Sequence, residues 1–254
     1  MHASPEVARK IADKIESKTY EGIPTKIILK MIFSYLKEYR PEIKYEIDLR
    51  EAICLLRPKP DFEQFVCFLL KEYGYEVLPP QIIKGKCVEH EIDGIAKRDK
   101  ETIYLETKHH FQPHTYTGVG ICLEAQAILE DLRESFNSDL SLINFTKALV
   151  VCNTKFSDHA IKYAHCKSIE LIGWKVPPEF GLEQMIEKKK FYPITFLKSM
   201  DERSRYKLAD NGIFLIRQLA YCDIGELEKK TKIPKKRLKA FINESRKILG
   251  GQLT

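Results

Sequence analysis

The sequence contains no long hydrophobic run. No apolar segment among its 254 residues approaches the ~18 residues that a membrane-spanning helix requires. The N-terminus also lacks the apolar stretch of a secretory signal peptide. We therefore interpret the chain as soluble and cytoplasmic, with no membrane partner.

The sequence also has no Cys-x-x-Cys pair, although it contains seven cysteines. This absence argues against a zinc ribbon, and the odd number of cysteines argues against a disulfide framework. Buried, reduced thiols fit the mostly apolar surroundings of these cysteines better. A length of 254 residues with 44% hydrophobic content allows one large domain or two to three small ones.

Positive charge is concentrated at the C-terminal end. Residues 187–254 contain 17 Lys and Arg against 8 Asp and Glu, a net charge of +9, so the remainder carries about −3 of the overall +6. A basic appendage on a near-neutral body predicts a module that binds a polyanion. An ordinary solvated, charged surface is the alternative.

The most informative pattern lies in residues 88–110, where apolar and polar residues alternate on both sides of a polar turn at residues 98–101. This alternation predicts two short strands joined as a hairpin. If the turn is symmetric, Asp93 lies opposite Glu106. The Cβ atoms would then be about 4.5–5.5 Å apart, a separation at which like charges destabilise a sheet unless something compensates.

Lys108 follows Glu106 by two residues and so shares its face of the strand, whereas Ile103, Leu105 and Thr107 are expected on the opposite face. Two carboxylates and one ammonium would therefore converge. A surface hairpin with a salt bridge between Glu106 and Lys108 is the alternative, and a turn one residue longer would change the register.

This combination suits a phosphodiester-cleaving metal site. Mg²⁺ typically binds one or two protein carboxylates and also accepts phosphate oxygens. Such an ion lowers the pKa of water and so generates a nucleophile near neutral pH. A nearby lysine can stabilise charge that develops on the phosphoryl oxygens.

The elements after this hairpin predict a mixed sheet. The apolar run 148–152 and the segment 169–172 predict two strands, and the residues after Ser157 predict a helix between them. A strand–helix–strand crossover implies a parallel pair added to the antiparallel hairpin. We therefore expect an α/β fold with helices on both sides of the sheet.

Two motifs joined by a short hairpin stand out: Ile92-Asp93-Gly94-Ile95-Ala96 and Leu105-Glu106-Thr107-Lys108. Together they resemble the core of the PD-(D/E)xK nuclease superfamily, and especially that of Mrr-type restriction endonucleases. The flanking helix and strand at 62–77 and the final strand–helix–strand at 147–174 fit the same order. The resemblance covers residues 58–175. It implies a restriction-endonuclease-like fold, Asp93 and Glu106 as ligands of Mg²⁺ (or Mn²⁺), and Lys108 as a catalytic residue.

The resemblance adds two further candidates. Glu63 would be a third acidic residue near the metal, although in the first turn of a helix capped by Asp61 it could equally stabilise the helix dipole. Gln126 could orient the attacking water or contact DNA, and an ordinary surface glutamine is the alternative. Four histidines lie near this hairpin: His90, His109, His110 and His114. We expect them to contact solvent or phosphate rather than to bind a metal.

Residues 1–57 are predicted to form small helices. Three parts of this region resemble the helical part of an ATP-cone. They are the segment from Ala3, Ser4 and Pro5 to Ala8, the segment 23–28, and the region of Tyr45 and Arg50. An ATP-cone usually opens with a basic hairpin, a glycine turn and a lysine helix that contribute to nucleotide binding. The sequence starts after that portion, so we do not expect these residues to bind a nucleotide.

Residues 179–254 are predicted to form a linker helix at 182–190 and a small all-helical tail, which resembles helix-hairpin-helix units. Asn211 and Gly212 would form one hairpin, and the turn before Pro234 would form the other, without its usual glycines. Such hairpins offer backbone N–H groups to DNA phosphates. Basic residues could add electrostatic contacts; they are Lys235, Lys236, Arg237 and Lys239.

Three regions are thus expected: 1–57, 58–178 and 179–254. The function they predict is that of a metal-dependent endonuclease that hydrolyses phosphodiester bonds in DNA. The alternative is a catalytically inactive DNA-binding or assembly protein, or a nucleotide-responsive regulator, on a nuclease fold. The presence of Asp93, Glu106 and Lys108 together favours the enzyme. The sequence leaves open RNA or branched DNA as substrate and a homo-oligomeric state.

Overall fold

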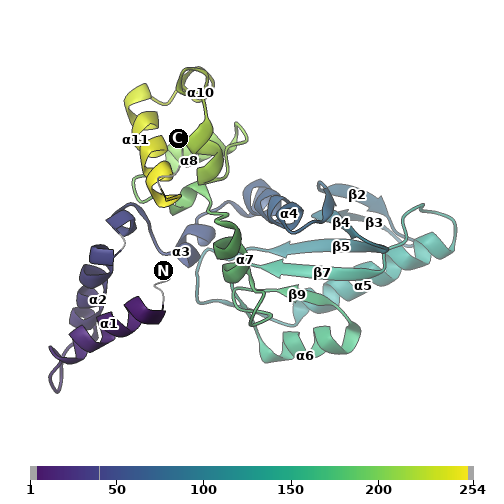
Figure 1. Cartoon of the computed structure of the whole chain (residues 1–254). Coiled ribbons are helices and arrows are strands. Elements are labelled where there is room, and N and C mark those ends of the chain that lie inside the picture. Colours follow the sequence, from purple (N-terminus) through teal and green to yellow (C-terminus); the bar gives the residue numbers. More distant parts are fainter. Residues whose placement is uncertain (1–4, 40, 251–254) are drawn as a thin grey trace. The chain divides into compact units, whose positions relative to one another are not determined.

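The computed structural model describes residues 5–39 and 41–250, whose helices and strands are drawn in Figure 1. Their contacts group residues 50–195 into one compact unit and the described residues outside that range into another. The second unit joins an N-terminal and a C-terminal segment of the chain, and between them the ammonium of Lys247 donates a 3.0 Å hydrogen bond to the hydroxyl of Tyr45. The contacts therefore give two units, whereas the sequence predicts three regions.

A five-stranded sheet with strand order β1-β4-β5-β7-β9 forms the centre of residues 50–195. The pairs β1–β4 and β4–β5 are antiparallel, whereas β5–β7 and β7–β9 are parallel. The mixed α/β fold is therefore confirmed. The strands are β1 (Glu76–Leu78), β4 (Gly94–Arg98), β5 (Glu101–Lys108), β7 (Lys147–Cys152) and β9 (Glu170–Ile172).

The hairpin of β4 and β5 has the register that a symmetric turn predicts. Gly94 pairs with Leu105 at one end, and Arg98 pairs with Glu101 at the other. Between them, Asp99 adopts the left-handed conformation with φ 56°, which aspartate tolerates better than most residues. The position of Asp93 relative to Glu106 follows from this short turn.

The strand before Asp93 belongs to a different sheet. β2 (Gln81–Lys84) and β3 (Glu89–Ile92) form a separate antiparallel pair, and Asp93 is the single residue between β3 and β4. The prediction of one uninterrupted strand from Val88 to the turn is therefore wrong. A period-two pattern cannot reveal this break, because the alternation continues while the chain changes its pairing partner.

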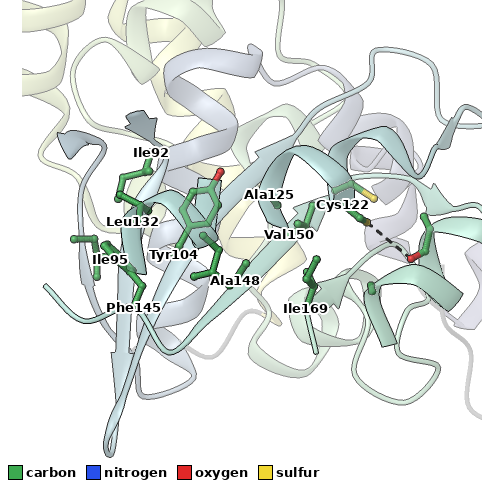
Figure 2. Packing of buried hydrophobic residues seen from close by; sticks show 14 of the residues in the cluster. Ile92, Ile95, Tyr104, Cys122, Ala125, Leu132, Phe145, Ala148, Val150 and Ile169 are labelled. Atoms are coloured by element: carbon green, nitrogen blue, oxygen red, sulfur yellow. Dashed lines mark hydrogen bonds between the residues drawn. The ribbon is translucent and has the colours of Figure 1, made fainter. Parts of the chain in front are cut away.

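One face of the central sheet is covered by α5 (Gly120–Asn137) and α6 (Asp158–Lys167), as Figure 1 shows. The apolar core beneath them is drawn in Figure 2, where side chains from the strands meet those of α5. Burial of each branched or aromatic side chain contributes about 1.5–3 kcal/mol, which holds the strands in register. This core includes Ile95, Tyr104, Ala125, Leu132, Phe145, Ala148 and Val150.

The other face carries α4 (Glu63–Glu72) and α7 (Leu182–Lys189), and the hydroxyl of Tyr73 donates a 3.0 Å hydrogen bond to the carbonyl of Met185 between them. The expected linker helix thus belongs to this unit. Asp61 does not cap α4 as expected, because its carboxylate accepts two hydrogen bonds of 2.7 and 2.8 Å from Arg57. Gly74 follows the end of the helix with φ +85°, in the left-handed region that favours glycine.

The second unit is helical, as predicted for both ends of the chain. Ala3 and Ser4, on which the ATP-cone resemblance partly rests, lie outside the described residues. In the part of the chain that the structure describes, no helix is long and apolar enough to cross a membrane. The helices of this unit are α1 (Pro5–Glu16), α2 (Thr25–Tyr39), η1 (Pro41–Tyr45), α8 (Glu202–Ala209), α9 (Ile216–Tyr221), α10 (Ile224–Thr231) and α11 (Lys235–Ile248).

The remaining elements are short. A five-residue irregular turn, η2 (Pro58–Phe62), precedes α4, and its Lys59 is extended with φ −122° and ψ 136°. This geometry separates the Lys59 side chain from the regular helix that follows. The others are α3 (Leu49–Cys54), η3 (Ile194–Phe196) and the parallel pair β6 (Tyr116–Thr117) and β8 (Lys155–Phe156).

A side chain at Gly94, directly after Asp93, would be crowded. A Cβ atom there would lie 3.0 Å from the carbonyl oxygen of Leu78 and 3.2 Å from Cδ2 of Leu105. We expect Gly94→Ala to lower the free energy of unfolding by about 1–3 kcal/mol, as overpacking typically does. Urea unfolding measures this effect. Gly118→Ala is the control, since an added Cβ there meets nothing within 4 Å; equal stability of the two variants would contradict the prediction.

Candidate active site

A cleft of about 310 Å³ lies at the carboxyl end of β5. Four of the five catalytic candidates line it: Glu63, Asp93, Glu106 and Lys108. The hairpin register brings the β5 residues to this place, and the break before β4 brings Asp93. Other residues of the lining are Lys59, Glu91, Thr107, His109, Ile121, Glu124 and Ile128.

Asp93 is held by the neighbouring strand. Its side chain is almost completely buried, and its Oδ2 accepts hydrogen bonds of 2.8 Å from both the backbone N–H and the hydroxyl of Thr107. The expectation that Thr107 turns away from the acidic residues is therefore wrong. Because Asp93 sits where the chain leaves β3, its carboxylate reaches the Thr107 side of β5.

Glu106 is held from its own strand. The hydroxyl of Tyr104, two residues earlier and fully buried, donates a short hydrogen bond to Oε2 of Glu106. Burial, and then the nearby Asp93 charge, raise the pKa of Glu106 to about 7, although the Tyr104 hydrogen bond opposes this shift. Tyr104 therefore fixes Oε2 of the carboxylate, and among the described residues Oε1 accepts no hydrogen bond.

Glu63 is brought to the site by the first turn of α4. Its side chain is 4% exposed, and burial together with the Asp93 charge raises the pKa of its carboxyl group. Its Oε1 accepts no hydrogen bond in the described structure, although it lies 3.2 Å from the ammonium of Lys59. Glu63 is thus positioned near Asp93 in the cleft.

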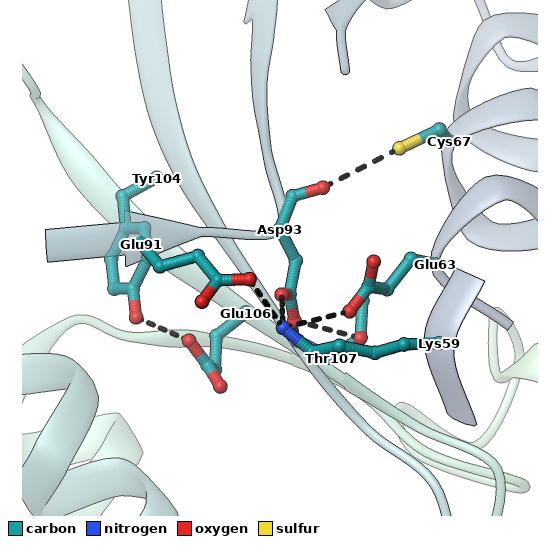
Figure 3. A network of polar contacts seen from close by, with 8 residues as sticks. All are labelled: Lys59, Glu63, Cys67, Glu91, Asp93, Tyr104, Glu106 and Thr107. Carbon is teal, nitrogen blue, oxygen red and sulfur yellow. Dashed lines mark hydrogen bonds and ion pairs between the residues drawn. The ribbon is translucent and has the colours of Figure 1, made fainter. Parts of the chain in front are cut away.

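Lys59 joins three carboxylates, a feature that sequence reasoning missed. Its ammonium lies 2.9 Å from Glu91, 3.2 Å from Glu63 and 3.5 Å from Asp93, as Figure 3 shows. These contacts raise the pKa of Lys59, the Glu91 hydrogen bond most. A lysine between two prolines matches no catalytic motif, so only the positions of three separate elements reveal this role.

Lys108 lies at the exposed end of β5 and lines the same cleft. The alternative interpretation assigns Lys108 to a salt bridge with Glu106. Within residues 5–39 and 41–250 no ion pair joins these two side chains, and Glu106 is bonded to Tyr104 instead. The ammonium of Lys108 is therefore available to a ligand in the cleft.

Gln126 is not among the residues that line the cleft. Its side-chain amide donates a 2.6 Å hydrogen bond to Glu130, one turn further along α5. Glu124 and Ile128, four residues apart on one face of the helix, line the cleft in its place. Once the position of the cleft is known, helical spacing favours Glu124 over Gln126 as the residue of α5 that lines it.

The histidines of this region serve mainly as structural donors and acceptors. His109 lines the cleft, but its Nε2 lies 3.1 Å from the carbonyl oxygen of Ile53, and burial lowers its pKa. His90 contacts Asp131 at 2.7 Å. Within residues 5–39 and 41–250, none of the hydrogen bonds and ion pairs of the Asp93 side chain involves a histidine.

The two hairpin candidates of the C-terminal part differ in their local geometry. Gly212 has φ +77°, and the side-chain amide of Asn211 donates a 2.8 Å hydrogen bond to the carbonyl of Lys207. At the second turn, the backbone N–H of Lys235 donates a 2.9 Å hydrogen bond to the Glu228 carboxylate. That N–H group therefore already has an internal acceptor, which a phosphate would have to replace.

The basic residues of α11 are exposed on its first turns: Lys235, Lys236, Arg237 and Lys239. Arg237 forms an ion pair with Asp201. Next to this pair lies a hollow of about 300 Å³, whose basic lining residues are Arg203, Lys207, Lys232 and Arg237. The C-terminal charge is thus gathered around the turn between α10 and α11.

Comparison with known proteins agrees with the fold. Residues 58–175 match the restriction endonuclease family, and residues 192–249 match the family described as AF1548-like, C-terminal. An uncharacterised protein of Archaeoglobus fulgidus is 34% identical over 182 residues, which cover 72% of this chain and 98% of that protein.

A crystal structure described as AF1548, a protein of unknown function, superposes with a TM-score of 0.64 at 34% identity and covers 75% of this chain and 97% of its own. The chain belongs to the AF1548-like family. This AF1548-like chain therefore combines a restriction-endonuclease-like domain, of the kind found in nucleases, with the C-terminal region of its family. Neither an ATP-cone nor a helix-hairpin-helix family is among these matches.

The side chains in the cleft of this AF1548-like protein fit a hard divalent cation. Oδ1 of Asp93 and Oε1 of Glu106 are carboxylate oxygens that no hydrogen bond shorter than 3.5 Å occupies. Among residues 5–39 and 41–250, no three His, Cys, Asp or Glu side chains surround a common metal position. Two carboxylates are within the number that Mg²⁺ typically takes from a protein, because this ion keeps several waters.

The raised pKa of Glu106 predicts a pH-dependent stability difference. Between the pKa of about 4.5 for an unfolded glutamate and about 7 in the folded protein, the unfolded state loses the proton first, so wild-type stability falls as pH rises. Glu106→Gln should be nearly neutral below pH 4.5 and should stabilise the metal-free protein by about 1–2 kcal/mol above pH 7, after allowance for solvent screening.

Urea unfolding in EDTA between pH 4 and pH 8 measures this difference. Glu124→Gln serves as the control, because Glu124 lines the same cleft but is exposed. A stability difference between Glu106→Gln and wild type that stays constant across this range would contradict the prediction.

Proposed function

We propose that this protein is a metal-dependent endonuclease that hydrolyses phosphodiester bonds in DNA. The observation that carries the proposal is the meeting of Asp93, Glu106 and Lys108 in one cleft of a restriction-endonuclease-like domain. The separate origins of these residues, at a strand break and at the end of β5, make an accidental surface cluster a poor explanation.

Asp93 and Glu106 would hold Mg²⁺, or Mn²⁺ in its place, through the oxygens that their internal hydrogen bonds leave free. When bound, such an ion stabilises negative charge on the phosphate and favours ionisation of water. Thr107 and Tyr104 keep the two carboxylates in fixed orientations. Glu63 would act as the third acidic residue beside them.

Hydrolysis forms a bond between a water oxygen and phosphorus and breaks one P–O ester bond, while protons pass to the leaving oxygen and to solvent. Negative charge grows on the phosphoryl oxygens in this step. Lys108, exposed at the cleft and without an ion pair to Glu106, supplies a compact positive charge to those oxygens.

The decisive experiment replaces Asp93 by asparagine rather than alanine. Alanine would leave the Thr107 N–H without its buried acceptor, whereas asparagine can keep that hydrogen bond and loses only the charge. We expect Asp93→Asn and Lys108→Met to lower single-turnover cleavage by at least about 10²–10³-fold. Lys108→Arg should also be impaired, because the planar guanidinium misplaces the donor. Calorimetric Mn²⁺ binding should weaken only in Asp93→Asn.

Plasmid, branched and single-stranded DNA, each with Mg²⁺, Mn²⁺ or EDTA, are the substrates for this test. Asp99→Asn, in the turn at the far end of the same hairpin, is the matched control. Wild-type cleavage by Asp93→Asn would overturn the assignment of Asp93 to the site. No cleavage of any substrate by the folded wild type would favour a DNA-binding protein without nuclease activity.

We further propose that the C-terminal part binds the DNA backbone. The hairpin of Asn211 and Gly212 would offer backbone N–H groups. The exposed start of α11 would offer positive charge. The hollow beside Arg237 extends this basic surface with three further cationic side chains, and Asp201 is its acidic lining residue. This arrangement supports electrostatic contact with phosphates more than contact with bases.

Charge-removing substitutions test this surface better than a deletion, because the C-terminal part packs with the N-terminal helices. A triple variant, K235Q/K236Q/K239Q, should weaken DNA binding and reduce the slope of log K against log salt by about 2–3. Fluorescence anisotropy from low to moderate salt measures the slope. The triple variant K26Q/K30Q/K37Q on α2 removes equal charge as the control; an identical slope in both variants would refute the assignment.

A further inference from the structure

We propose that Lys59 competes with the divalent cation for one oxygen, Oδ1 of Asp93, and thereby sets the metal affinity of the cleft. The inference rests on the proposed metal-dependent function. It assigns a role to a residue outside the Asp93, Glu106 and Lys108 set. The inference is based on the different hydrogen-bond partners of the two carboxylate oxygens of Asp93.

Oδ2 of Asp93 is fully engaged. It accepts one hydrogen bond from the backbone N–H of Thr107 and one from the Thr107 hydroxyl, both of 2.8 Å. A carboxylate oxygen has two lone-pair positions, so these two donors occupy both. Oδ1 is the oxygen that remains for a cation, and this is the oxygen that faces the Lys59 ammonium at 3.5 Å (Figure 3).

A divalent cation and an ammonium cannot share this oxygen without strong repulsion. Asp93 is 5% exposed, so water screens charges around it poorly. An ion bound at Oδ1 would also approach Glu63, whose buried Oε1 lies 3.2 Å from the same ammonium. Metal binding therefore requires the Lys59 ammonium to withdraw from both buried carboxylates.

The contacts of Lys59 allow this movement. Its side chain is 58% exposed, and its shortest contact, 2.9 Å, is to Glu91, whose side chain is 66% exposed. The ammonium can therefore stay with Glu91 while it leaves Asp93. The lysine side chain is a flexible four-carbon stem, so a change of its rotamer moves the ammonium away from Asp93.

Calorimetric titration with Mn²⁺ tests the exchange in the full-length protein. Lys59→Met should bind Mn²⁺ at least about fivefold more tightly than wild type, within the usual range for coupled sites. Lys59→Arg, which keeps the charge, should stay near the wild-type affinity. Lys71→Met removes an exposed lysine from the far end of α4, outside the cleft lining, and should change nothing.

Glu91 supplies an independent second test. Removing its charge leaves Asp93 and Glu63 as the remaining partners of Lys59, so Glu91→Gln should weaken Mn²⁺ binding. In the Lys59→Met background the same substitution should have no effect, because the ammonium is gone. Equal weakening in both backgrounds would instead mean that Glu91 contacts the metal directly, and would overturn this part of the inference.

The outcomes separate this inference from the proposed function. Equal Mn²⁺ affinity in wild type and in Lys59→Met overturns the competition while leaving a metal-dependent nuclease intact. No Mn²⁺ binding in either protein overturns both. Thermal unfolding in EDTA verifies that each variant is folded, and the additional rise in Tm on adding Mn²⁺ should be larger for Lys59→Met than for wild type.

Discussion

The cleft depends on the burial of two carboxylates beside each other. Glu63 and Asp93 are 4% and 5% exposed, and an unpaired buried charge costs several kcal/mol. The surrounding structure offsets that cost in two ways. Thr107 donates two hydrogen bonds to Asp93, and Lys59 brings a positive charge to both residues. Without Thr107, and without either Lys59 or a cation in its place, the two buried negative charges would repel each other and destabilise the folded cleft.

Two local features of the backbone place the Asp93 carboxylate in the cleft. Asp93 occupies the one-residue break between two sheets, and a side chain at Gly94 would be crowded by Leu78 and Leu105. Both features position the Asp93 carboxylate against Thr107. The AF1548-like protein thus uses the point where β-pairing changes, rather than the interior of a strand, to hold its central acidic residue.

Much of this could be predicted from the sequence, for identifiable reasons. A short turn at Asp99 fixed the register of β4 and β5, and continuous apolar runs indicated the parallel strands, because both signals are local. The role of Lys59 could not be predicted, since it results from η2, β3 and the strand break meeting in space. The contact between Asp93 and Thr107 was hidden because the alternating pattern continues through the change of sheet.

The C-terminal region shows a related limit. Its net charge of +9 is visible in the sequence, but charge counting does not say which cations are already paired. Arg237 is bound to Asp201, and the first N–H of α11 is bound to Glu228. Contact with a phosphate there would exchange one partner for another, so its affinity gain is smaller than the charge suggests.

An exchange of charged partners is also expected in the cleft. A cleft that collects acidic side chains for a divalent cation must remain folded when that cation is scarce. A lysine tethered to an exposed partner meets this requirement, because it neutralises the buried carboxylates and can leave them without unfolding. The stability of the metal-free state then comes with weaker metal binding, since every contact that Lys59 makes to Asp93 has to be replaced. In the proposed competition, the metal affinity of the cleft therefore depends on how evenly a monovalent and a divalent charge compete for one oxygen of Asp93.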